Sequence, residues 1–158
     1  MVLEKRKVYL GNLHFGDTAV YNIKSLLLDL LSFNSEMHKM SIKGENEKFW
    51  NRIAKRYDWI TIKLTRDYPF LIQRIVNDVN GAENVLEVAT GTGLIAIALT
   101  GKVGHIEAID FSPKMIGFAK RKAFKDRIEN IHFSVQNAYK LEFEDGLFDV
   151  AICSNALH

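Results

Sequence analysis

From residue 84 onward, short apolar runs alternate with longer segments of helical pattern. Strands are predicted at 84–88, 105–110, 130–135 and 147–154. Helices are predicted at 92–100 and from Pro113, where Ser112 caps the first turn and proline takes the first helical position, its favoured place. Strands that alternate with helices form βαβ units, whose strands lie parallel in one sheet. The sequence therefore predicts the α/β class.

The chain before this alternation is mostly helical in pattern. Residues 1–17 are predicted to be extended or loop, and apolar residues recur at helical spacing over 18–33, 46–59 and 67–79. The expected organisation is an N-terminal extension with one helix over residues 1–44. A core of residues 45–158 follows it.

A glycine-rich turn joins the first strand of the core to its helix, in the segment Val85-Leu86-Glu87-Val88-Ala89-Thr90-Gly91-Thr92-Gly93-Leu94. Gly91 and Gly93 allow the backbone to approach a ligand where a side chain would collide. Asp110 lies 17 residues after Gly93, at the end of the second strand. A carboxylate there can accept two hydrogen bonds from a ribose diol. The turn is thus predicted to bind a nucleoside-containing ligand rather than nothing.

Glu87 distinguishes two ligand classes. Gly91-Thr92-Gly93-Leu94-Ile95-Ala96 matches the dinucleotide pattern G-x-G-x-x-G/A, which alone is a weak signal. A dinucleotide would bring a charged pyrophosphate near the Glu87 carboxylate and be repelled by it. S-adenosyl-L-methionine (SAM) has no phosphate and carries an ammonium and a sulfonium. The pattern therefore favours SAM over NAD or FAD.

Residues 87–93 resemble motif I of the class I SAM-dependent methyltransferases, with Ala89 where the family usually has its first glycine. Asp110-Phe111-Ser112-Pro113-Lys114-Met115 resembles the family's next segment. The resemblance implies that Asp110 holds the ribose hydroxyls and that Phe111 and Met115 flank the adenine. Core filling is the alternative role of Met115.

Three further segments resemble the same family. Asn137 and Ala138 occupy the place of a Gly-Asp-Ala segment, so Asn137 is expected to accept from the adenine amine or to be a turn asparagine. Residues 148–158 resemble the fourth strand and its loop, where Ser154 and Asn155 would face SAM through the backbone. Residues 49–58 resemble the lid helix of the ubiquinone/menaquinone C-methyltransferase branch. Tyr57 would close over SAM there, or simply pack.

The resemblance implies a Rossmann-like, doubly wound parallel sheet with strand order 3-2-1-4-5-7-6. The chain ends just after its fourth strand, so the C-terminal part of the fold is expected to be missing. The fourth strand would then be an exposed apolar edge, a liability for pairing with another chain. A homodimer that covers this edge is predicted, with helix 18–33 as an alternative cover.

The predicted function is SAM-dependent methyl transfer to a small-molecule acceptor. The alternative is a catalytically inactive SAM-binding or protein-interaction module. No catalytic residue is assigned, although His158 could be a general base by its position. A net charge of +2 does not suggest a nucleic-acid partner, and no metal-ligand spacing or membrane-spanning apolar stretch occurs. The single Cys153 fits a cytoplasmic location. The predicted cofactor-binding residues are Tyr57, Glu87, Ala89, Thr90, Gly91, Gly93, Asp110, Phe111, Met115, Asn137, Ala138, Ser154 and Asn155.

Overall fold

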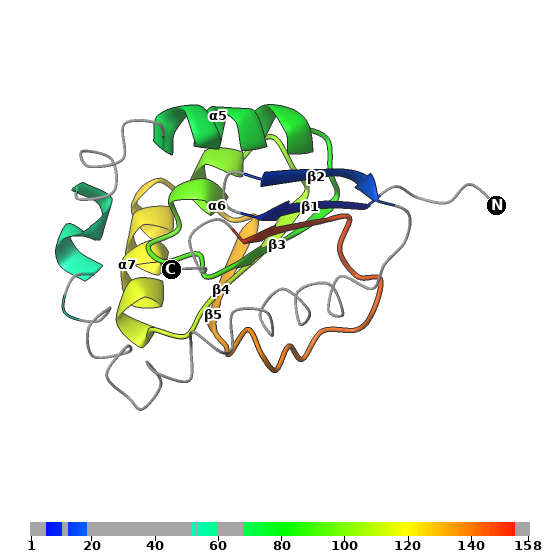
Figure 1. Cartoon of the computed structure of the whole chain (residues 1–158). Coiled ribbons are helices and arrows are strands. Elements are labelled where there is room, and N and C mark those ends of the chain that lie inside the picture. Colours follow the sequence, from blue (N-terminus) through cyan, green and yellow to red (C-terminus); the bar gives the residue numbers. More distant parts are fainter. Residues whose placement is uncertain (1–5, 11–12, 19–51, 53, 60–67, 154–158) are drawn as a thin grey trace.

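The computed structural model describes residues 6–10, 13–18, 52, 54–59 and 68–153 of the chain. In chain order its elements are β1 (Arg6–Leu10), β2 (Leu13–Thr18), the 3-10 turn η1 (Ala54–Arg56), α5 (Tyr68–Val79), β3 (Asn84–Val88), α6 (Leu94–Leu99), β4 (His105–Asp110), α7 (Pro113–Lys125), β5 (Ile131–Val135) and β6 (Val150–Cys153). After an N-terminal pair of strands, helices and strands alternate from α5 to β5, and β6 follows β5 with no helix between them (Figure 1).

The strands form one sheet in the order β2-β1-β6-β3-β4-β5. Strands β3 to β6 run parallel, with Val85 opposite Ile106 on one side and Val150 on the other. The predicted α/β class and parallel, Rossmann-like sheet are confirmed. Strands β3 and β4 have the predicted bounds, because each is a compact apolar run between turn residues.

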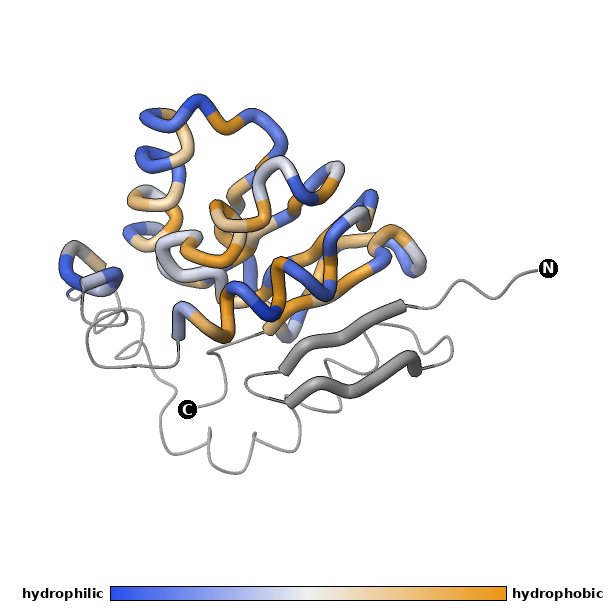
Figure 2. The backbone as a smooth tube through the Cα atoms, turned by 90° about the horizontal axis from the view of Figure 1, so that it is seen from above, coloured by the Kyte–Doolittle hydropathy of each residue, from blue (hydrophilic) through white to orange (hydrophobic). Residues whose placement is uncertain are grey.

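The main core lies between one face of the sheet and helices α5, α6 and α7. Apolar residues of the helices recur one helical turn apart, so each helix turns one stripe toward the strands. Figure 2 shows hydrophobic residues concentrated along the central strands and the inner sides of these helices. The fully buried members include Ile75, Val85, Ile95, Leu99, Ile106 and Ile152. A smaller cluster on the other face joins Leu86, Val88 and Ile109 to residues of the loop after β5.

Two polar side chains fix the ends of these elements, one through a neighbouring residue and one through a distant strand. Ser112 lies just before α7, and its hydroxyl oxygen accepts from the Met115 backbone N–H at 3.2 Å, as the sequence predicts. Asp149 lies just before β6, and its Oδ2 accepts from the backbone N–H groups of Glu83 at 3.1 Å and Asn84 at 2.8 Å. Asp149 therefore joins the starts of β6 and β3, two strands that are distant in sequence.

The prediction that the fourth strand of the core is an unpaired edge is wrong. That strand, β6, is paired with β3 on one side and with β1 on the other, with Val8 opposite Ala151 and Leu10 opposite Cys153. Strand β1 runs parallel to β6 and takes the place that the family order gives to a fifth strand, and β2 adds antiparallel to β1. Residues from the opposite end of the chain thus supply the missing backbone partners.

Other predictions about the N-terminal part are not tested here. The helix over 18–33 lies almost entirely outside the described residues. The domain boundary between residues 44 and 45 stays a prediction, although β1 and β2 belong to the same sheet as the core strands.

Candidate functional site

The predicted binding turn lies at the carboxyl ends of β3 and β4. The Thr90 backbone N–H donates to the Ile109 carbonyl oxygen at 2.9 Å, and the Gly93 N–H donates to the Thr90 carbonyl oxygen at 2.9 Å. The first bond ties the turn to the end of the neighbouring strand, and the second closes the turn itself. Ligands of open parallel sheets bind at this edge, outside the carboxyl ends of the strands.

The buried Glu87 side chain is hydrogen-bonded to the turn and to the start of helix α6. Its side chain is 3 % exposed, and its Oε2 accepts from the Thr90 hydroxyl at 2.7 Å and from the Ala96 backbone N–H at 3.0 Å. Burial raises the pKa of Glu87 to about 8, against the two hydrogen bonds, which lower it, and with some repulsion from Asp110. The sequence placed Glu87 next to the positive charges of SAM. In the structure Glu87 joins the turn to helix α6, and its contact with SAM stays a prediction.

Asp110 faces the turn from the end of β4. Its Oδ2 accepts from the Gly91 backbone N–H at 2.8 Å, and its Oδ1 accepts from the Ser112 N–H at 2.8 Å. Burial raises the pKa of Asp110, while these two bonds lower it. Each carboxylate oxygen can accept a second hydrogen bond. Asp110 is therefore both an anchor of the turn and an acceptor that can still bind a diol.

Three residues of the turn have left-handed backbone conformations, with φ of 56° at Ala89, 56° at Gly91 and 78° at Gly93. Of the three, only Ala89 has a side chain, and a Cβ makes the left-handed backbone conformation less favourable by about 1–2 kcal/mol. At Gly93 a Cβ would lie 2.9 Å from the Phe133 ring, so glycine at this position allows close packing of the turn against β5.

Tyr57 lies over the turn. A Cβ placed on Gly91 would lie 3.4 Å from the Tyr57 ring, so glycine at this position allows the ring to come close. The neighbouring Asp58 receives hydrogen bonds from the Thr92 hydroxyl and from Lys122. The sequence identified Tyr57 but missed Asp58, Thr92 and Lys122. No sequence signal links them, because they lie on three separate segments.

The residues that were predicted to contact the adenine differ in their exposure and in their partners. Phe111 is 41 % exposed at the end of β4, whereas Met115 is 1 % exposed, as core filling would require. The Asn137 Oδ1 accepts from the Tyr139 backbone N–H at 2.9 Å, which is the turn role considered for it. Ala138 is half-buried and packs against the smaller core cluster. Ser154 and Asn155 lie outside the described residues.

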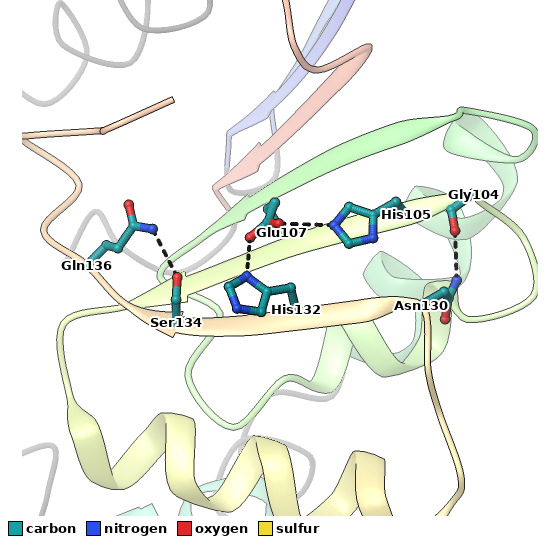
Figure 3. A network of polar contacts seen from close by, with 7 residues as sticks. All are labelled: Gly104, His105, Glu107, Asn130, His132, Ser134 and Gln136. Atoms are coloured by element: carbon teal, nitrogen blue, oxygen red, sulfur yellow. Dashed lines mark hydrogen bonds and ion pairs between the residues drawn. The ribbon is translucent and has the colours of Figure 1, made fainter. Parts of the chain in front are cut away.

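A separate polar cluster lies on β4 and β5, on the face turned away from α7 (Figure 3). Glu107 pairs through Oε1 with His105 Nε2 at 3.0 Å and through Oε2 with His132 Nδ1 at 2.7 Å. The two histidines meet different oxygens of one carboxylate: His105 lies two residues away on the same strand, and His132 lies opposite Glu107 on β5 as a cross-strand partner. Within the described ranges, no group of three or more His, Cys, Asp and Glu side chains could hold a metal ion. Nor is any helix of that part long and apolar enough to cross a membrane.

Comparisons with known proteins agree with this geometry. Residues 85–158 match a family described as a methyltransferase domain. Demethylmenaquinone methyltransferase of Leptospira interrogans is 34 % identical over 110 residues, which are 64 % of this chain and 44 % of that protein. Ubiquinone/menaquinone biosynthesis C-methyltransferase of Geobacter sp. (strain M21) is 34 % identical over 128 residues, which are 75 % of this chain and 54 % of that protein. The chain thus spans about half the length of these relatives.

The fold is also found among solved structures. A protein of Methanococcus maripaludis, described as a SAM-dependent methyltransferase, superposes with a TM-score of 0.58 at 23 % identity. The match covers 67 % of this chain and 50 % of that one, and it supports the fold. The sequence matches, the fold and the glycine turn between Glu87 and Asp110 point to the same family. The chain is a member of the class I SAM-dependent methyltransferases, similar to the quinone C-methyltransferases.

Proposed function

We propose that the turn Ala89–Gly93 binds SAM and that the protein takes part in methyl transfer to a small molecule. The observation that carries this proposal is the position of Asp110. Its carboxylate is buried, is fixed by the backbone N–H groups of Gly91 and Ser112, and keeps one acceptor position on each oxygen. A ribose diol supplies two O–H donors for these two positions, and this pairing would offset the cost of burying the carboxylate.

The remaining residues fit the other parts of SAM. Tyr57 and the turn backbone would hold the methionine end, and Glu87 and Thr90 would support the turn beneath it. The Phe111 ring, 41 % exposed, offers an apolar surface for the adenine. We keep Met115, Asn137, Ala138, Ser154 and Asn155 as predicted contacts.

The relatives suggest the class of acceptor. One is named a demethylmenaquinone methyltransferase, and the other is named a C-methyltransferase of ubiquinone/menaquinone biosynthesis. We therefore propose a quinone-type ring as the acceptor, methylated at carbon. The sulfonium of SAM supplies an already activated methyl group. What the protein must add is the alignment of acceptor and methyl group and the exclusion of water.

Titration calorimetry with SAM tests the binding site. Asp110→Ala should weaken SAM binding by about 1.5–3 kcal/mol, the range for hydrogen bonds to a charged group. Glu144→Ala removes an exposed carboxylate of the loop after β5 and serves as the matched control, with unchanged affinity expected. Unchanged affinity in Asp110→Ala would refute the assignment, and tight binding of NADH would refute the ligand class.

An assay with methyl-labelled SAM tests the reaction. Demethylmenaquinone analogues are compared with a pool of unrelated small metabolites, and label is expected only in the quinone. Binding of SAM without turnover on any acceptor would instead favour an inactive SAM-binding module.

Two further proposals concern the setting of the protein. We retain a cytoplasmic location, for which the single cysteine is the support. The homodimer stays a prediction. Its original reason, an unpaired edge at β6, no longer applies, because β1 is paired with β6.

A further inference from the structure

Asp58 connects three segments around the glycine turn. It lies on the helical turn that continues from η1 to Trp59, and its side chain is half-buried. The Thr92 hydroxyl donates to Asp58 Oδ1, and Lys122 Nζ lies 2.7 Å from Oδ2. Thr92 belongs to the turn that precedes α6, and Lys122 lies in the last turn of α7. One carboxylate thus ties the segment Ala54–Trp59 to both sides of the site.

The two partners differ in character. Thr92 is 1 % exposed, so the hydroxyl that donates to Asp58 is shielded from water on the Thr92 side. A charge-assisted hydrogen bond of this kind is among the stronger ones in proteins. The side chains of Lys122 and Asp58 are 30 % and 35 % exposed, so their ion pair is partly screened. We expect the hydroxyl to contribute more than the lysine.

The residue next to Asp58 is the one that covers the site. The Tyr57 ring lies against Gly91, and Ala54 in the preceding turn is buried. Whatever holds Asp58 in place therefore holds the Tyr57 ring over the turn. The hydrogen bond to Thr92 starts only one residue from Gly91, so the cover and the turn are joined directly.

We propose that Asp58 is a positioning residue of the SAM site, which fixes the segment Ala54–Trp59 over the glycine turn through Thr92 and Lys122. The inference rests on the proposed function, since it assumes that the turn binds SAM. Asp58 itself need not touch the ligand. Its effect is to keep the Tyr57 ring closed and so to slow the release of bound SAM.

The experiment measures the rate of SAM dissociation by stopped flow, together with SAM affinity and unfolding in urea, on the full chain. Asp58→Ala removes both contacts and should speed dissociation by about tenfold, the loss of one charge-assisted hydrogen bond at about 1.4 kcal/mol. Lys122→Met should speed dissociation by only about two- to threefold, because an exposed ion pair is weak. Lys120→Met, at an exposed lysine of the same helix, is the control and should change nothing.

A pair of conservative variants separates positioning from folding. Thr92→Ser keeps the hydroxyl and should keep slow release, whereas Thr92→Val keeps the size and loses the hydroxyl and should release SAM as Asp58→Ala does. In the double variant Asp58→Ala/Thr92→Val the two effects should not add, because both remove the same bond. This pair keeps the inference testable even if Asp58→Ala folds poorly.

The outcomes are distinguishable. If Thr92→Val and Asp58→Ala release SAM at the wild-type rate, or lose affinity only as far as they unfold, Asp58 is merely structural and the inference is wrong. If the wild-type chain does not bind SAM at all, the proposed function and this inference both fail. If the wild type binds and Asp110→Ala weakens binding while Thr92→Val does not change release, only this inference fails.

Discussion

The burial of Glu87 predicts an unusual dependence of stability on pH. The perturbation is Glu87→Gln, which keeps the shape of the side chain and an oxygen that can accept from Thr90 and Ala96. Glutamine does not titrate. The difference in unfolding free energy between wild type and variant therefore reports the proton on Glu87 together with the repulsion between Glu87 and Asp110, because the other titrating groups are common to both.

The sign follows from the direction of the shift. The pKa of Glu87 rises from 4.5 to about 8 on folding, so the folded protein binds this proton more tightly than the unfolded chain. The stabilising contribution of this proton is fully present below pH 4.5. It is lost as the pH rises toward 8, because the unfolded chain then gives up the proton and the folded protein still holds it.

The magnitude follows from the same values. One unit of pKa difference is worth about 1.4 kcal/mol, so the rise predicts a total loss of about 4–5 kcal/mol. Roughly 3 kcal/mol of this falls between pH 5 and pH 8. Such a loss is a large part of the free energy of unfolding of an ordinary domain, which is about 5–15 kcal/mol.

Urea unfolding of both proteins at half-unit steps from pH 5 to pH 8 measures the effect. We expect the wild type to lose stability relative to Glu87→Gln by about 3 kcal/mol over this range. Parallel pH profiles of the two proteins would show that Glu87 is ionised in the folded state over the whole range. The argument from burial would then be refuted.

Three other predictions concern the backbone and the sheet. Ala89→Gly should raise the free energy of unfolding by about 0.5–1 kcal/mol, because glycine adopts the positive φ of this position without strain. Ala98→Gly, within helix α6, should lower the free energy of unfolding by a similar amount. Urea unfolding that ranks the two variants in the opposite order would contradict this prediction. Gly93→Ala should lower the free energy of unfolding by about 2–3 kcal/mol, because the new Cβ would collide with the Phe133 ring and the φ is positive. Gly117→Ala in α7 places its Cβ in open space and should raise that free energy by about 0.5–1 kcal/mol. Thermal melts that show equal effects of the two substitutions would rule out the clash. Deletion of residues 1–18 should expose β6 and cause self-association at micromolar concentration, measured by light scattering against the full chain; equal masses would show that the hairpin does not protect the edge.

Local patterns in the sequence predicted most of the core strands and helices. Asn84–Val88 and His105–Asp110 are short apolar runs between turn residues, and Ser112-Pro113 marks a helix start that needs only neighbours in sequence to form. Glu87, Gly91 and Asp110 were recognisable for the same reason, because each lies in a short run of residues at a strand end or in the turn that follows it.

The tertiary structure alone decided what depends on distant segments. The pairing of Arg6–Leu10 with β6 joins residues more than 140 positions apart, and a short extended run carries no signal of its partner. The tie of Asp58 to Thr92 and Lys122 is of the same kind. Gly93 shows the difference in a single residue. The sequence indicated that a glycine is needed there, and only the tertiary structure shows that a Cβ at this position would also meet the Phe133 ring. Hydrogen-bonded ladders and close packing are set by which surfaces meet, and that is determined when the chain folds as a whole.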